Sequence, residues 1–342
     1  MGQFEDTIEW LREENYPLTR YNTLRYILDK EEDDSEVKDS LVKMMNSRPI
    51  STILEHRNED GGFMNRSWFE RAKTESYKRA IRWGYLPKYK STIWQVRFLA
   101  QAGVPAKEPR IKALGKYALN HVYEEGRGFF NDFLACVNGD MVWALCKFGF
   151  GERSELKKAF ELHVRYQKYE NGDWIPPEEW PYNGKQGHCL GPCTCYNGMT
   201  QLLRAMTVVP ESYWTSKAKE AKKNTIDFFL SHGIIRRKWK QTFSKNLPSC
   251  RKHRTTPLLE FTAPIGAQSD PIEVTTNLLL LGVNASKLDE AIGFVLSKQN
   301  MKGRWVLDKT LSPMYSSWGK KGQESKWITF RALRMLKLAD HL

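Results

Sequence analysis

Apolar positions along the chain follow the period of amphipathic helices, and these helices come in pairs. Each pair consists of a buried apolar helix, a glycine-containing turn and an amphipathic helix with charges on its outer face. The clearest pairs span 91–122, 139–167 and 272–299, and weaker copies span 22–47 and 198–233. A last helix at the carboxyl end has no partner after it. The pattern predicts an all-α fold of about five to six helical hairpins, each of about 40 residues.

A recurring terminator closes four of these helices. Each copy ends in glycine-rich polar residues and an aromatic: ILEHRNEDGGF (53–63), ALNHVYEEGRGF (118–129), HVRYQKYENGDW (163–174) and FVLSKQNMKGRW (294–305). A glycine is expected to take a positive φ there while the aromatic packs back. With an unpaired helix at each end, the repeats predict one α/α toroid (barrel) domain over residues 1–342 whose termini meet. An open solenoid is the alternative.

Four stretches interrupt the helical pattern, at 63–90, 175–192, 239–268 and 306–325. They are rich in Trp, Pro, Tyr and Cys, which is not typical of linkers. We therefore expect ordered loops on one face of the fold, where function is usually found. No run with strand periodicity competes with the helices.

The charge of the chain indicates an anionic partner. A formal charge of +13 and a pI of about 9.3 suit a pyrophosphate, an acidic polymer, nucleic acid or an anionic membrane surface. The basic residues are densest at 236–240 and 251–254, where a solvated surface loop is the plainer explanation. No recognisable nucleic-acid-binding module accompanies the charge, so nucleic acid is not an expected partner.

The sequence also bears on the compartment. Its first residues, MGQFEDTIEWLREEN, are acidic and polar, unlike a secretory signal or a transit peptide. No apolar run approaches the ~20 residues of a transmembrane helix, so any membrane contact is expected to be peripheral. Six cysteines in a chain of this length fit a reducing compartment. Together these features predict a cytoplasmic protein.

Two terminators show a helix that ends in Gln, followed by Gly-x-Trp. They are carried by Tyr166, Gln167, Gly172 and Trp174, and by Phe294, Gln299, Gly303 and Trp305. This pattern resembles the squalene cyclase repeat of the terpenoid cyclase and protein prenyltransferase superfamily. The chain looks most like prenyltransferase and squalene oxidase repeat proteins in the segments RYNTLRYILDKEEDDSEV, KSTIWQVRFLAQAGV, CVNGDMVWALCKFGFGE, CTCYNGM and ESKWITFRALRMLK.

That resemblance implies a toroid in which the first residues of the inner helices line one mouth of a central apolar cavity. The positions placed on this rim are Ser91, Thr92, Cys136, Asn138, residues 193–197, Ser269, Asp270, Ser325 and Lys326. The free amide groups of helix N-termini also favour anions. A basic, Cys-rich rim is therefore expected beside an apolar cavity.

A cluster of thiols suggests zinc as a cofactor. Cys189, Cys193 and Cys195 follow His188 with the spacing C-x3-C-x-C, which differs from the C-x2-C of structural zinc sites. Protein prenyltransferases hold zinc with Asp, Cys and His, and their HTCY-type segment resembles residues 193–196, where cysteine replaces the histidine. With Asp270 as the carboxylate, the expected metal ligands are His188, Cys189, Cys193, Cys195 and Asp270. The alternative is that Asp270 is a helix N-cap and that the thiols are packing residues.

Candidate functional residues follow from the same rim and loops. Asp270, Cys195 and Cys136 are the catalytic candidates. The substrate-binding candidates are Trp94, Asn138, Tyr182, Tyr196, Asn197, Trp318 and Lys326. Aromatics of this kind stabilise a prenyl chain or a carbocation by cation–π contact, although at helical spacing they also serve as ordinary core. Neither the DxDD nor the DDxxD motif of terpene cyclases occurs in the chain.

Three functions remain open at this point. The leading hypothesis is an isoprenoid-handling transferase or cyclase, which the resemblance implies and which takes a small isoprenoid or anionic substrate. The second is a non-catalytic toroid that binds a lipid or a protein partner. The third is a polysaccharide lyase or hydrolase on a similar toroid, whose positive charge suits polyuronates. That enzyme needs an exposed groove with Arg or Lys and a base.

Overall fold

The computed structural model describes residues 4–130, 134–169, 195–235 and 258–342. Within these ranges the chain forms fifteen α-helices and four strands of two residues each, so the predicted all-α class is confirmed. None of these helices combines the length and apolar character needed to cross a membrane.

The chain divides into two compact units. Unit 1 comprises 1–58, 98–104 and 259–342, and unit 2 comprises 59–97 and 105–258. A single domain over 1–342 stays a prediction.

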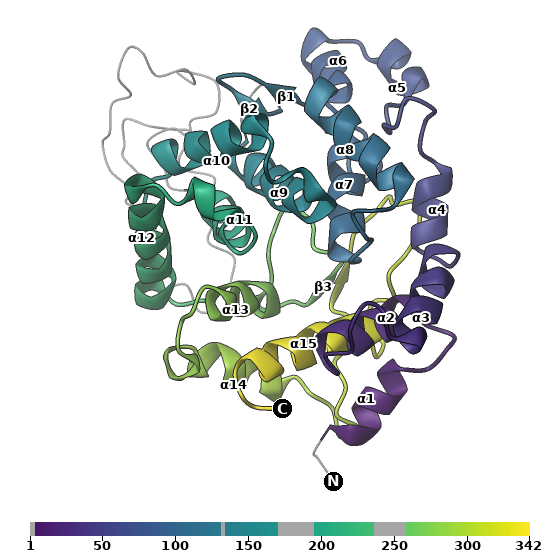
Figure 1. Ribbon diagram of the computed structural model, residues 1–342, viewed down its shortest axis with the longest axis vertical. Helices are drawn as coiled ribbons and strands as arrows, with labels where there is room; N and C mark the ends of the chain where they lie inside the picture. The colour runs from purple at the N-terminus through teal and green to yellow at the C-terminus, as the bar shows by residue number, and fades with distance from the viewer. Residues whose placement is uncertain (1–3, 131–133, 170–194, 236–257) are drawn as a thin grey trace. The chain divides into compact units, whose positions relative to one another are not determined.

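Unit 1 brings the amino-terminal and carboxyl-terminal helices together. Its helices are α1 (Glu5–Leu11), α2 (Pro17–Tyr26), α3 (Ser35–Met45), α4 (Ile50–Glu55), α13 (Pro271–Leu280), α14 (Asp289–Ser297) and α15 (Lys326–Leu338). Figure 1 shows α15 beside α13, and α15 also packs against α1 and α2. Lys337 of α15 donates to the Ile27 carbonyl at 2.9 Å and pairs with Asp29. The predicted meeting of the terminal helices is therefore confirmed.

Unit 2 contains the other helices. They are α5 (Arg66–Arg71), α6 (Glu75–Arg82), α7 (Thr92–Gln101), which crosses the unit boundary after Arg97, α8 (Pro109–His121), α9 (Ala135–Leu145), α10 (Ser154–Tyr166), α11 (Tyr196–Met206) and α12 (Ser216–His232). Four of the five predicted hairpins appear as packed pairs, α9–α10 and α11–α12 here, and α2–α3 and α13–α14 in unit 1.

The short strands and turns connect these helices. In unit 2, β1 (Tyr123–Glu124) pairs antiparallel with β2 (Gly128–Phe129). In unit 1, β3 (Thr262–Ala263) pairs in parallel with β4 (Lys309–Thr310). Single turns of 3₁₀ or π helix lie at Cys146–Phe150, Glu211–Tyr213 and Ala285–Lys287.

Three of the terminators form the same kind of hydrogen bond at their closing aromatic residue. The backbone N–H of the buried aromatic donates to a side-chain oxygen in the first turn of a later helix. The pairs are Phe63 with Thr92 at 3.0 Å, Phe129 with Asn138 at 3.1 Å, and Trp305 with Thr329 at 3.0 Å. Gly61, Gly128 and Gly303 take positive φ values of 97°, 73° and 74°, which confirms the predicted role of glycine in these three copies. The fourth terminator ends outside the described residues.

Three helices of unit 2 converge on Asp140. This carboxylate of α9 pairs with Arg97 of α7 and accepts a hydrogen bond from Arg204 of α11 at 3.2 Å. The Arg204 guanidinium lies 3.5 Å from the ring centroid of Trp143. All three charged side chains are buried, so these ion pairs link α7, α9 and α11 in the interior of the unit.

The stretch 63–90 differs from the expectation of a loop, because it holds α5 and α6. Asn65 caps α5 by accepting from the Trp68 N–H at 3.0 Å, and Thr74 caps α6 by accepting from the Tyr77 N–H at 3.2 Å. Both helices are short, and α5 buries none of its residues. Their N-cap residues, Asn65 and Thr74, indicate where these helices begin, and a search for hydrophobic periodicity does not use such residues.

Candidate functional site

A pocket of ≈ 810 Å³ lies in unit 1, where the α1–α2 turn, the start of α4 and the segment leading into α15 meet. Aromatic, acidic and basic side chains line it together. The lining residues are Trp10, Glu13, Asn15, Tyr16, Pro17, Leu18, Thr19, Ser47, Arg48, Pro49, Ser317, Trp318, Gly319, Lys320, Gln323, Glu324, Ser325, Lys326 and Trp327. We call it the unit 1 pocket.

Two indole rings form one wall of the unit 1 pocket. Trp318 and Trp327 meet edge to face, with ring centroids 5.0 Å apart. Both are more than nine-tenths buried, and neither indole nitrogen has a hydrogen-bond partner among the described residues. A buried N–H without a hydrogen-bond partner lowers the folding stability by about 1–3 kcal/mol. A phenylalanine would fill much of the same space without this loss. These two tryptophans are therefore poorly explained as core residues alone.

Lys326 occupies the centre of a small aromatic box. Its ammonium lies 4.8 Å from the Trp10 ring centroid and 4.6 Å from that of Tyr16. It donates to the Trp10 carbonyl and to Glu13 Oε2, the latter at 2.9 Å. Burial lowers the pKa of Lys326 from its ordinary value, although the hydrogen bond to Glu13 opposes that shift. Lys326 begins α15 directly after its N-cap, Ser325, so the helix start fixes its position.

A second carboxylate, Glu324, lines the same pocket. It accepts from Arg304 Nη1 at 2.8 Å and from Asn300 Nδ2 at 2.9 Å. The hydrogen bond from Arg304 holds the pKa of Glu324 below its usual range. Glu324 is therefore ionised at neutral pH, while the Arg304 guanidinium also stacks 4.0 Å from the Trp10 ring centroid.

The unit 1 pocket also presents cations that no carboxylate neutralises. Arg48 and Lys320 are exposed on its lining, and neither forms an ion pair within the described part of the chain. Because Glu13 and Glu324 already have cationic partners, these two side chains leave the pocket with an excess of positive charge. An anionic or strongly polar ligand suits this lining better than a hydrocarbon.

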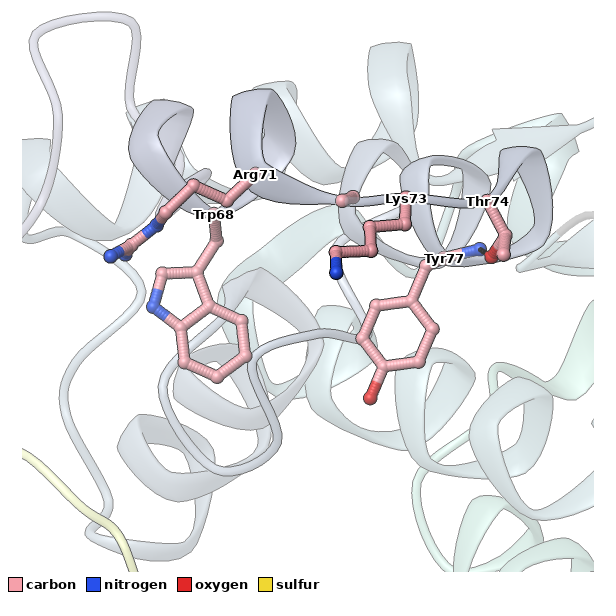
Figure 2. A pocket seen from close by; sticks show the side chains of 6 residues that line it. Trp68, Arg71, Lys73, Thr74 and Tyr77 are labelled. Atoms are coloured by element: carbon pink, nitrogen blue, oxygen red, sulfur yellow. Dashed lines mark hydrogen bonds between the residues drawn. The ribbon is translucent and has the colours of Figure 1, made fainter.

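A second hollow, of ≈ 470 Å³, lies in unit 2 between α5 and α6. Figure 2 shows the rings of Trp68 and Tyr77 projecting to the same side of the two helices, with Lys73 between them in that view and Arg71 at the edge. A smaller hollow of ≈ 320 Å³, also in unit 2, is lined by Lys107, Lys112 and Lys116 together with Phe148 and Phe150.

The structure brings two of the predicted substrate-binding residues together. Trp318 and Lys326 both line the unit 1 pocket. Trp10, Glu13 and Tyr16, which lie in or next to the acidic amino-terminal segment, were not predicted from the sequence. The predicted meeting of the termini could have identified these residues, because it places the amino-terminal segment beside the start of the last helix.

The other predicted substrate-binding residues do not line the unit 1 pocket. Trp94 is buried and donates its indole N–H to the Tyr85 carbonyl at 2.9 Å, while Asn138 holds the terminator at Phe129. Tyr196 packs edge to face on Phe229, and Asn197 follows it at the start of α11. Tyr182 lies outside the described residues. Backbone hydrogen bonds account for the side chains of Trp94 and Asn138.

Asp270 is a structural carboxylate. It caps α13 by accepting from the Glu273 N–H at 2.9 Å, and it forms a two-pronged ion pair with Arg331 at 2.7 and 2.8 Å. It is only 1% exposed. The N-cap interpretation of Asp270 is confirmed, and its oxygens are engaged by partners that leave little capacity for a metal or a substrate.

The thiols that are described do not form a metal centre. Cys195 caps α11, with its sulfur accepting from the Gly198 N–H at 3.3 Å. Burial and the neighbouring Cys195 raise the pKa of Cys136 to about 12, so Cys136 is a protonated thiol at neutral pH. Among the described residues no group of three His, Cys, Asp or Glu side chains is placed to hold a metal. The other predicted zinc ligands, His188, Cys189 and Cys193, lie outside them.

Comparisons with known proteins overturn the predicted resemblance. No family model matches the chain, and no curated protein matches it. A solved structure from Salmonella enterica serovar Paratyphi A, described as a possible member of the GH105 family, aligns with 92% of this chain and 98% of its own at 12% identity and a TM-score of 0.43. A likeness this weak carries no conclusion about activity.

The assignment to the terpenoid cyclase and prenyltransferase superfamily is therefore wrong, and the prenyltransferase and zinc expectations that came with it lose their support. Short Gln, Gly and Trp motifs carried that assignment. In the structure, Gly303 takes a positive φ in the turn after α14, and the Trp305 N–H donates to Thr329 of α15, so these residues join two helices of the repeat.

Proposed function

We propose that the chain binds an oligosaccharide in the unit 1 pocket and hydrolyses one of its glycosidic bonds. One observation carries the proposal: the pocket combines four aromatic side chains with two carboxylates, Glu13 and Glu324. Sugar rings present apolar C–H faces that pack on aromatic rings, and hydroxyl groups that bond to charged side chains. Glycoside hydrolysis generally uses a pair of carboxylic groups that flank the scissile bond.

The surroundings of the two carboxylates suit different roles. Arg304 and Asn300 keep Glu324 ionised, as a nucleophile or a base requires. Glu13 is half exposed in the pocket, and its side chain bonds to Lys326. In this proposal Glu13 is the second carboxylate of the pair. Trp318 and Trp327 form the wall against which a sugar ring packs.

A lyase is the second candidate, and Lys326 is the observation in its favour. β-Elimination from a uronate needs a cation on the sugar carboxylate and a base for the adjacent proton. Arg48 and Lys320 lie on the lining without ion-pair partners among the described residues, and Lys326, whose pKa burial lowers from its ordinary value, is the base in this alternative. The two reactions differ in their products, since elimination leaves a carbon–carbon double bond.

Incubation of the purified chain with a panel of neutral and acidic polysaccharides tests the proposal. We expect new reducing ends with at least one glycan, and loss of turnover with retained binding in Glu324→Gln and Glu13→Gln. Glu14→Gln is the matched control, because Glu14 is exposed beside Glu13 and pairs with Lys43 at 3.6 Å outside the pocket lining.

Three outcomes contradict part or all of the proposal. A product with an ultraviolet-absorbing double bond would show that the reaction is elimination and not hydrolysis. Binding without turnover across the panel rejects the proposed hydrolysis and leaves the proposal of a sugar-binding protein. Absence of binding to every glycan, with a folded protein, rejects a saccharide ligand altogether.

A further inference from the structure

The hollow between α5 and α6 is built by two equivalent caps. Asn65 and Thr74 are the N-cap residues, and each accepts a hydrogen bond from an aromatic residue three positions later, Trp68 at 3.0 Å and Tyr77 at 3.2 Å. The two aromatics therefore occupy the same position of successive helices. Figure 2 shows the result, with both rings on one side of the hairpin.

Packing does not explain these aromatics. The exposed fraction is 42% for Trp68 and 52% for Tyr77, and no residue of α5 is buried. Exposed aromatic rings that line a common hollow usually mark a binding surface. The hollow has a volume of ≈ 470 Å³ and opens to the solvent. An open hollow with a ring at either end admits a chain of sugar rings that stack on both aromatics.

The residues around the hollow carry a net positive charge, which favours an acidic ligand. Residues 66–82 contain six Lys or Arg against two Glu. Lys73 has no hydrogen-bond or ion-pair partner within the described ranges, and Arg71 bonds to the side chain and carbonyl of Ser67 rather than to a carboxylate. Arg82 lies over the Phe69 ring at 5.5 Å. The lining thus offers Lys73 and Arg71 as cations available to an acidic group.

We propose that this hollow is a second saccharide site, which binds a uronate-containing glycan chain. The sugar rings stack on Trp68 and Tyr77, and the carboxylate groups of the uronates meet Lys73 and Arg71. The site lies in unit 2 and performs no chemistry, so it goes beyond the proposed hydrolysis and stands even where the unit 1 pocket does not bind sugar. Its task is to hold an acidic polysaccharide on the protein.

Titration calorimetry of the full chain with an oligogalacturonate tests this site. We expect Trp68→Ala and Tyr77→Ala to weaken the corresponding binding step by about tenfold or more, and Trp68→Phe to recover part of it because a ring remains. Lys73→Gln weakens binding less and makes it less sensitive to salt, since it removes one charge contact. Lys112→Gln is the control, because it makes the same charge change on an exposed lysine of α8.

The test separates the two sites. Glu324→Gln and Trp318→Ala act on the unit 1 pocket and leave the step that depends on Trp68 in place. A neutral oligosaccharide of the same length is expected to bind at this step at least about tenfold more weakly. Equal binding of neutral and acidic chains overturns the acidic ligand, and an unchanged titration in Trp68→Ala overturns the site. Binding of anionic phosphatidylserine vesicles that requires Trp68, without oligogalacturonate binding, replaces the glycan by a membrane surface.

Discussion

Asn138 accepts a hydrogen bond from the backbone N–H of Phe129 at 3.1 Å, and its own amide nitrogen donates to the Ala159 carbonyl at 2.8 Å. The side chain is fully buried, and it joins the end of one hairpin to both helices of the next. Gly128 makes room for it, because an added Cβ there would lie 2.4 Å from Asn138 Oδ1. The asparagine expected at a substrate rim is therefore part of the repeat itself.

Replacement of Asn138 by alanine is expected to destabilise the protein without changing saccharide binding. The variant leaves one buried N–H and one buried carbonyl without partners, at a cost of about 2–4 kcal/mol. Asn46→Ala is the control, because Asn46 is exposed at the end of α3 and its amide donates only to the Val42 carbonyl of its own helix. Urea denaturation should show a change within about 0.5 kcal/mol for the control. Equal losses in the two variants would contradict this account of Asn138.

Glycines in the interior of two helices should respond to alanine in opposite directions. At Gly139 in α9, an added Cβ would lie 2.7 Å from the backbone carbon of Gln201 in α11, so we expect a loss of about 2 kcal/mol or more. At Gly293 in α14, nothing lies within 4 Å of that position, so alanine should stabilise the helix by about 0.5–1 kcal/mol. Thermal unfolding of the two variants measures both signs. A stabilised Gly139→Ala would mean that α9 and α11 do not pack as closely as described.

The helical period predicted the hairpins and the meeting of the termini, because both depend on local apolar spacing and on counting helices. It did not predict α5 and α6, whose short sequences are held by the caps Asn65 and Thr74. Lys326 was predicted because it lies at the start of the last helix, and Trp318 because it lies in the loop before that helix. Their partners Trp10 and Glu13 were missed, since side chains more than 300 positions apart show no pattern in the sequence until the fold is known.

Removal of the Asp270 carboxylate should affect stability rather than metal content. Asp270→Asn leaves the Arg331 guanidinium buried beside a neutral group, and breaking a buried ion pair in this way typically costs about 3–5 kcal/mol. The double variant Asp270→Asn with Arg331→Met should recover part of that loss, because it removes the unpaired charge. Denaturant unfolding checks the stabilities, and elemental analysis of the wild type and variants checks the metal. A metal that is present in the wild type and lost in Asp270→Asn would restore Asp270 as a ligand.

Lys326→Met is expected to weaken saccharide binding in the unit 1 pocket by about tenfold, a typical effect of removing a central charged contact. The variant removes the cation between the Trp10 and Tyr16 rings and leaves Glu13 without its partner. Lys38→Met is the control, since it makes the same change at an exposed lysine of α3 outside the pocket lining. Calorimetric titration with a glycan identified in the panel measures both. An equal effect at Lys38 would mean that Lys326 acts through net charge and not through contact with the ligand.

Stability should fall as the pH drops from 6.5 toward 4, and His163 should account for part of the loss. Burial lowers the pKa of His163 from 6.5 to about 4, so across this interval the unfolded chain binds a proton that the folded chain does not. Stability therefore rises with pH through the interval and is lost as the pH falls, by at most about 3 kcal/mol for this group. Urea midpoints measured from pH 7 to pH 4 should decline less steeply in His163→Gln than in the wild type. His341→Gln, at an exposed position near the carboxyl end, should follow the wild-type slope, and identical slopes in all three proteins would remove His163 as the cause.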